Sequence, residues 1–159
     1  MNLSIREAEV SDMQRVLELI QELATFEKEP DAVEVTEDDL IHGLTAEQPL
    51  FTCFVAEVDG VVQGMALCYP RYSTWKGPTI HLEDLIVTES LRGNGIGKAL
   101  YSAVMKHAYN KKVRRVEWVV LDWNENAIDF YQGTGAFVDA QWNIAQMNEA
   151  ALTKYVTQL

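Results

Sequence analysis

The feature that most constrains the fold is a glycine-rich stretch, LRGNGIGKAL, at residues 91–100. Gly93, Gly95 and Gly97 alternate with other residues, and a run with helical spacing follows. The first N–H groups of a helix are unpaired and carry partial positive charge. Without side chains in the way, a phosphate can sit directly on them. The stretch therefore predicts an anion site at a helix N-terminus, with Arg92 as an additional cation.

Hydrophobic periodicity predicts an α/β chain around this stretch. Strands are expected at 3–8, 51–58, 61–69, 79–87 and 115–121, with a strand-like region at 137–147. Helices are expected from Ser11, from Thr36, at 96–111, at 126–132 and in the tail from Asn148. Asp59-Gly60 predicts a hairpin, and Ser11 with Gln14 has capping-box spacing. This order predicts a central mixed sheet flanked by helices, in a single domain of residues 1–159.

Composition limits the possible partners. The formal net charge is −11, which argues against nucleic acid and anionic membranes, because binding to phosphates needs Lys and Arg. A negative field concentrates cations, so the charge suits a cationic substrate, although it also fits simple solubility. The chain shows no signal-peptide pattern and no apolar run long enough to span a membrane. Cys53 and Cys68 lie in apolar runs and are expected to be buried free thiols, which favours a cytoplasmic location.

Three phosphate-binding patterns can be compared with the glycine-rich stretch. A P-loop requires Ser or Thr after Gly-Lys, where this chain has Ala99, and a Rossmann fingerprint requires different glycine spacing. The pattern R-x-x-G-x-G does fit, with Arg92, Gly95 and Gly97. It resembles the pyrophosphate-binding signature of the GCN5-related N-acetyltransferases (GNAT), which use acetyl-coenzyme A. The alternative is a glycine-rich turn before a helix.

The resemblance extends along almost the whole chain. HLEDLIV precedes the glycines, and VVLDWNENAIDFYQGTGA resembles the second signature of the superfamily through Asn124, Ala127, Tyr131 and Gly135. Within the superfamily, the chain resembles the diamine (spermidine/spermine) acetyltransferases. YSTWKG, FEK and VLDWN are most similar to the thialysine acetyltransferase branch, which acetylates the side-chain amine of S-aminoethylcysteine. The resemblance implies a GNAT acyl-CoA N-acyltransferase fold and a homodimer.

The resemblance also implies the residues that bind coenzyme A. Strand backbone groups would hold the pantetheine arm, the glycine-rich stretch the pyrophosphate, and the second signature the remainder. These residues are Leu85, Ile86, Val87, Arg92, Gly93, Asn94, Gly95, Ile96, Gly97, Lys98, Asn124, Ala127 and Tyr131. For Asn124 the alternative is a helix cap.

Acyl transfer to an amine needs a base, an oxyanion donor and an acid. The resemblance assigns Tyr131 as the acid for the leaving thiolate and Glu83 as the base that acts through water. The alternatives are a packed tyrosine and a carboxylate in a surface ion pair. Asp84 follows Glu83, and adjacent strand residues face opposite ways, so only one of the two is expected in the site unless the strand is bulged. We favour Glu83.

The resemblance implies an amine site formed by Phe26, Glu27, Ser73, Trp75, Glu83 and Glu117. Tyr72 is a further candidate wall, and Asp122 a source of negative potential. The polyamine-specific relatives carry Tyr-Glu where this chain has Phe26-Glu27, and Asp where it has Ser73. One carboxylate that would hold a polyamine is therefore absent. The three histidines show neither triad nor metal spacing and receive no role.

Together these features predict an acetyl-CoA-dependent N-acetyltransferase of a small cationic amine. Thialysine-like amines come first, and diamines or polyamines second. The alternative from another class is a non-catalytic acyl-CoA sensor, which would need neither Tyr131 nor Glu83.

Overall fold

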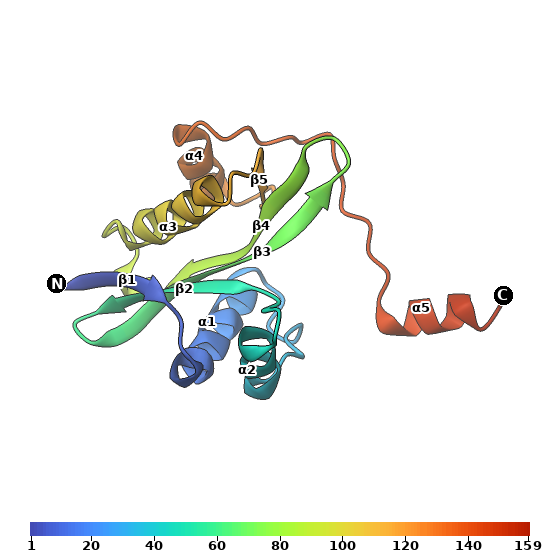
Figure 1. Cartoon of the computed structure of the whole chain (residues 1–159), viewed down its shortest axis with the longest axis horizontal. Coiled ribbons are helices and arrows are strands. Elements are labelled where there is room, and N and C mark those ends of the chain that lie inside the picture. Colours follow the sequence, from blue (N-terminus) through green and yellow to red (C-terminus); the bar gives the residue numbers. More distant parts are fainter. The chain divides into compact units, whose positions relative to one another are not determined.

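Five strands form one sheet in the order β1-β2-β3-β4-β5 in the computed structural model, which describes all 159 residues (Figure 1). The first four are antiparallel neighbours, and β5 runs parallel to β4. Their bounds are Leu3–Glu7, Thr52–Val58, Val61–Ser73, Gly77–Val87 and Val116–Glu117. The sheet is therefore mixed, as the sequence predicts.

Helices cover both faces of this sheet (Figure 1). α1 (Met13–Phe26) and α2 (Glu37–Thr45) lie on one face, and α3 (Ile96–Asn110) on the other. The core beneath α1 and α2 consists of apolar side chains from both helices and from the strands, namely Met13, Val16, Leu19, Leu40, Cys53, Val55, Val62, Met65, Leu67 and Ile86. A crossover connection through α3 joins β4 to β5, so that the two strands pair in parallel.

The β2–β3 hairpin is confirmed at Asp59-Gly60, where both residues have positive φ, 50° and 86°. These values are typical of a type I′ turn, which matches the twist of the flanking strands. Cys53 and Cys68, on the two strands of this hairpin, are both buried free thiols, as predicted.

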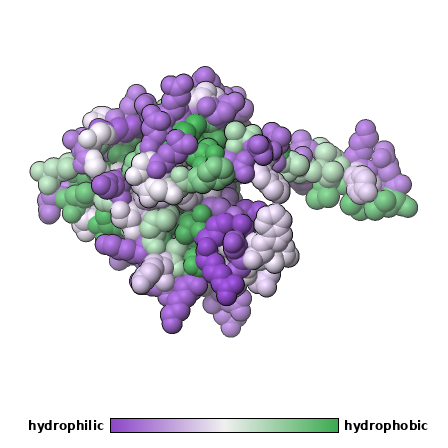
Figure 2. All heavy atoms as spheres, turned by 90° about the horizontal axis from the view of Figure 1, so that it is seen from above, coloured by the Kyte–Doolittle hydropathy of each residue, from purple (hydrophilic) through white to green (hydrophobic).

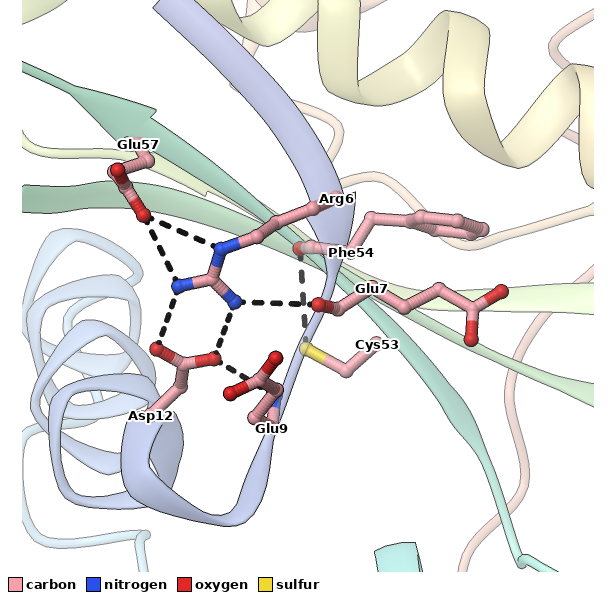
Figure 3. A network of polar contacts seen from close by, with 7 residues as sticks. All are labelled: Arg6, Glu7, Glu9, Asp12, Cys53, Phe54 and Glu57. Carbon is pink, nitrogen blue, oxygen red and sulfur yellow. Dashed lines mark hydrogen bonds and ion pairs between the residues drawn. The ribbon is translucent and has the colours of Figure 1, made fainter. Parts of the chain in front are cut away.

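The predicted start of the first helix is wrong in detail. A 3₁₀ turn (Val10–Asp12) precedes α1, and the capping box is formed by Glu9 and Asp12 instead of Ser11 and Gln14. Asp12 is held in place by Arg6, whose guanidinium donates to both carboxylate oxygens at 2.7 and 3.0 Å (Figure 3). The same guanidinium donates to Glu57 at 3.2 Å. One cation thus ties β1, β2 and the entry to α1 together.

The chain divides into two compact units, Met1–Val119 and Val120–Leu159, and the sheet lies in the first. The second contains α4 (Glu125–Gly133) and α5 (Glu149–Val156), capped by the side chains of Asn124 and Asn148. The strand-like region predicted at 137–147 is wrong. No other strand exists in this unit to pair with it, and a lone strand leaves its backbone groups unpaired.

The predicted strand at 115–121 is also shorter than expected. It is confined to Val116–Glu117, which pair only with Ile80 and His81.

Hydrophilic side chains cover much of the face seen in Figure 2. No helix is both long and apolar enough to cross a bilayer.

Candidate active site

A β-bulge in β4 defines the centre of the candidate site. Leu67 of β3 pairs with Asp84, but its neighbour Cys68 pairs with Leu82, so Glu83 is one extra residue on β4. Such an insertion shifts the alternation of side chains along the strand. The strand thus has the bulge that the sequence analysis named as the exception, and Glu83 and Asp84 do not face opposite ways.

Both carboxylates lie on the face covered by α1. Asp84 pairs with Leu67, which belongs to the core beneath that helix, and Glu83 accepts a hydrogen bond from Tyr69, which packs against the same core. Paired residues of neighbouring strands share a face. The bulge thus brings together two carboxylates that a regular strand would separate.

Asp84 is the more deeply buried of the two carboxyl groups. Burial, and then the negative charges of Glu83 and Glu27, raise the pKa of Asp84 to about 6. Burial also raises the pKa of Glu27, which follows the last residue of α1. Three carboxyl groups close enough to influence one another are a strong attractor for a cation.

Glu83 has two neighbours of its own. The Tyr69 hydroxyl donates to Oε2 of Glu83 at 2.9 Å, and Nε2 of His81 lies 3.5 Å from the same oxygen. The other carboxylate oxygen has no such neighbour, and half of the Glu83 side chain is exposed. The group is therefore held, yet reachable from solvent.

The glycine-rich stretch forms an open cradle at the start of α3. Gly93 and Gly95 have φ of 79° and 80°, and no atom lies within 4 Å of where a Cβ would stand. A Cβ on Gly97 would meet only Val87, at 3.8 Å. Ala99 donates to the Gly95 carbonyl, and the amides before it have no partner four residues back. The backbone here fits a pyrophosphate.

The neighbouring end of β4 suits an extended ligand. Leu85, Ile86 and Val87 pair with β3, whereas β5 pairs with β4 only at Ile80 and His81. One edge of β4 beyond His81 therefore has no neighbouring strand. Free backbone groups at a sheet edge can bind an extended chain such as pantetheine.

The structure places Arg92 and Phe26 against each other. The guanidinium lies 4.9 Å from the centre of the Phe26 ring, and its Nε donates to the Val87 carbonyl at 3.0 Å. Phe26, which directly precedes Glu27 in the sequence, thus packs on the glycine-rich stretch. This contact fixes the end of α1 next to the cradle.

Ser73 and Trp75 lie away from the carboxylates, in the turn between β3 and β4. The Ser73 hydroxyl accepts from the N–H groups of Trp75 and Lys76, and the Trp75 side chain is 76% exposed. Gly77 starts β4, and at ~3.3 Å per residue Glu83 is about 20 Å further along. Within one chain, Ser73 and Trp75 do not meet Glu83.

Glu117 also has other partners. Arg71 and Arg115 both approach its carboxylate to 2.7 Å, so its charge is already compensated. Trp118 beside it makes an edge contact with Tyr101. The role of Glu117 in the amine site stays a prediction.

The residues of the second signature lie in the second unit. Asn124 accepts from the Ala127 amide as the cap of α4, so the capping alternative describes one of its contacts. Tyr131 is buried on α4, with its ring 5.4 Å from that of Phe130. Asp122 lies in the segment before the helix. The roles of these residues remain predictions.

Sequence reasoning missed Asp84, Tyr69 and His81. Strand alternation favoured Glu83 over Asp84 as the residue in the site. His81 received no role because the histidines show neither triad nor metal spacing. A bulge is set by pairing with the neighbouring strand, so the pattern of β4 alone does not reveal it.

Comparison with known proteins decides the family. The sequence model of the Acetyltransferase (GNAT) family matches residues 13–136. The chain belongs to the GNAT family. This GNAT acetyltransferase is 40% identical over 140 residues to a thialysine N-epsilon-acetyltransferase of Bos taurus, covering 83% of this chain and 82% of the relative. It is 32% identical over 158 residues to the human spermidine/spermine N(1)-acetyltransferase-like protein 1, covering 93% of this chain and 23% of the relative.

A solved structure supports the fold. An aminoglycoside N-acetyltransferase, AAC(6')-Iy in complex with CoA, matches this GNAT acetyltransferase with a TM-score of 0.72 and 22% identity. The match covers 93% of this chain and 95% of the other. This match confirms the predicted GNAT fold, and the family match confirms the acetyltransferase class.

Proposed function

We propose that this GNAT acetyltransferase transfers an acetyl group from acetyl-CoA to the side-chain amine of a small cationic substrate, with thialysine or a related diamine first. One observation carries the proposal. The bulge in β4 sets Glu83 and Asp84 on one face beside Glu27, where α1 ends against the glycine-rich stretch. An amine-binding cluster thus adjoins a phosphate-binding cradle.

The proposed coenzyme site uses the backbone of the cradle and of β4. Gly93 to Lys98 would hold the pyrophosphate on their amides, and Leu85 to Val87 would hold the pantetheine arm. When bound, acetyl-CoA supplies the acetyl thioester. Support comes from the open space at Gly93 and Gly95 and from the CoA in the AAC(6')-Iy structure.

The proposed amine site uses charge. Asp84 and Glu27 attract the ammonium group, and Glu83 takes its proton through a water molecule, because only the neutral amine is a nucleophile. Tyr131 is proposed, from the resemblance, to give a proton to the leaving thiolate. The second signature crosses from one unit to the other, so we propose that residues 1–159 act as one catalytic domain.

Substrate choice within this class rests on the relatives and on Ser73. The Bos taurus relative is named for thialysine, and Ser73 shapes a turn where polyamine-specific relatives carry a carboxylate. Spermidine or spermine is the second candidate, favoured by the human relative's name. We also propose a homodimer, since the exposed Trp75 and Tyr72 offer a contact for a second copy.

The test is turnover on a panel of thialysine, lysine, ornithine, putrescine, spermidine and spermine, with products identified by mass. We expect thialysine to give the highest kcat/KM. Glu83→Gln should lower kcat roughly 100-fold or more while acetyl-CoA still binds, because the base is lost and the cradle is intact. Coenzyme binding without turnover on any amine would instead support the sensor alternative.

A further inference from the structure

Two side chains from neighbouring strands converge on a single oxygen of Glu83. Tyr69 on β3 donates its hydroxyl to Oε2 at 2.9 Å, and Nε2 of His81 on β4 lies 3.5 Å from the same atom. Tyr69 pairs with His81 across the strands, next to the bulge that displaces Glu83. The arrangement therefore follows from the strand register and the bulge.

The contact with the Glu83 carboxylate decides which ring nitrogen of His81 carries the hydrogen. An ionised carboxylate only accepts hydrogen bonds, so the nitrogen that faces Glu83 has to carry the hydrogen. Nδ1 of His81 is buried and has no partner, which disfavours an N–H there. Burial lowers the pKa of His81, so the ring is neutral at pH 7. His81 is therefore the tautomer with hydrogen on Nε2.

The two rings also support each other. His81 is only 8% exposed, and its ring centre lies 5.2 Å from that of Tyr69. Tyr69 in turn packs against the core beneath α1. Burial, and then the hydrogen bond to Glu83, raise the pKa of Tyr69, so its hydroxyl keeps its proton at neutral pH. Both donors are thus rigid and permanently available.

We propose that Tyr69 and His81 are positioning residues that occupy Oε2 of Glu83, so that Oε1 is the oxygen that receives the proton of the amine substrate. The proposal rests on the proposed role of Glu83 as base. The ammonium group loses a proton to water, and water passes a proton to Oε1. The lone pair left on nitrogen forms the new bond to the acetyl carbon as the C–S bond of the thioester breaks. The leaving thiolate takes a proton from Tyr131, and the second proton of the amine restores the tyrosine. Oε2 keeps the hydrogen bond from Tyr69 and the close contact with Nε2 of His81 throughout.

The charged and titratable groups around Glu83 lie on three strands and at the end of one helix: Tyr69 and Arg71 on β3, His81 and Asp84 on β4, Glu117 on β5, and Glu27 directly after α1.

The experiment compares Tyr69→Phe, His81→Phe and the double variant with the parent enzyme. Both substitutions keep an aromatic ring in place, and thermal unfolding checks the fold. Tyr109→Phe, which removes an exposed hydroxyl at the end of α3, is the control. We expect kcat to fall roughly 10- to 100-fold in the double variant, with KM for acetyl-CoA unchanged. An unchanged kcat in folded variants would overturn the proposal.

A second measurement does not depend on turnover. ¹⁵N NMR of histidine-labelled protein reports the tautomer of His81, whose signals are identified by their loss in His81→Phe. We expect hydrogen on Nε2 at pH 7.5, and hydrogen on Nδ1 or a charged ring would refute the proposal. A positive NMR result without turnover on any amine would refute the proposed function and leave the Glu83 geometry intact.

Discussion

At the scale of single residues, Asp84 is placed where the fold opposes its charge. It is buried beside Glu83 and Glu27, and its pKa of about 6 lies well above the ordinary value for an aspartate. At neutral pH the carboxylate is nevertheless ionised, so it destabilises the folded state. A bound cation would relieve this strain, which links amine binding to stability.

Asp84→Asn should therefore stabilise the protein while weakening amine binding. Because the folded pKa is raised, the cost of ionising Asp84 grows as pH rises from about 3.8 to 6 and is constant above that. The variant should gain roughly 1 to 3 kcal/mol at pH 7.5 and little at pH 4. Urea unfolding at both pH values measures this, and an equal gain at the two would contradict it. KM for the amine should rise about 10-fold or more.

The sequence makes Glu83 a candidate but does not reveal which residues surround it. The run LEDLIV gives no sign of the extra residue, since the bulge depends on how β4 pairs with β3. His81 lies two residues before Glu83, so the two share a face of the strand. The sequence still does not show that Tyr69 of β3 lies opposite His81 and reaches the same carboxylate. Long-range pairing thus decides the site at this scale.

At the scale of elements, local signals predict helices well and their ends less well. The end of α3 shows why. Lys112 follows the helix with φ of 57° and donates to the Tyr109 carbonyl, while Val113 donates to Ala108. This is a Schellman motif, which favours glycine at the left-handed position. A lysine there accepts a conformation it disfavours.

Lys112→Gly should stabilise the protein by roughly 0.5 to 1 kcal/mol, because glycine adopts the left-handed conformation without strain. The cost of ordering glycine partly offsets this gain. Urea unfolding measures the change, with Lys111→Gly as the control. Lys111 has helical φ, so its replacement should destabilise. Destabilisation by Lys112→Gly would contradict the expectation.

Strands outside the antiparallel core were harder to predict than those within it. Residues 51–58 and 61–69 are apolar runs joined by a tight turn, so their pairing is a local matter. The region at 137–147 has apolar residues at strand-like spacing but no strand in its own unit to pair with. Strand propensity without a partner does not make a strand.

At the scale of the whole molecule, the exposed turn between β3 and β4 bears on assembly. Tyr72 and Trp75 are 73% and 76% exposed, which is unusual for aromatic side chains lying so close together. In the proposed homodimer this turn contacts the second copy. The aromatic residues expected at the amine site would then come from the partner.

Trp75→Ala should shift the enzyme from dimer to monomer and raise KM for the amine, because aromatic anchors dominate interface energies. Light scattering on a sizing column measures the mass. Acetyl-CoA binding should be unchanged, since the cradle lies at the start of α3. Leu159→Ala, which removes another exposed apolar side chain, is the control. A parent enzyme that is monomeric and fully active would contradict the homodimer.

The extra residue in β4 also means that folding and chemistry rest on separable parts of the sequence. Strands β3 and β4 match on both sides of Glu83, and only this position lacks a counterpart. Deleting Glu83 would remove the defect without interrupting the ladder and would turn Asp84 and its neighbours back into ordinary alternation. If the proposed role of Glu83 as base is right, such a protein would keep the sheet and the cradle and would lose the acetyl transfer. One residue would then separate the fold from the proposed activity.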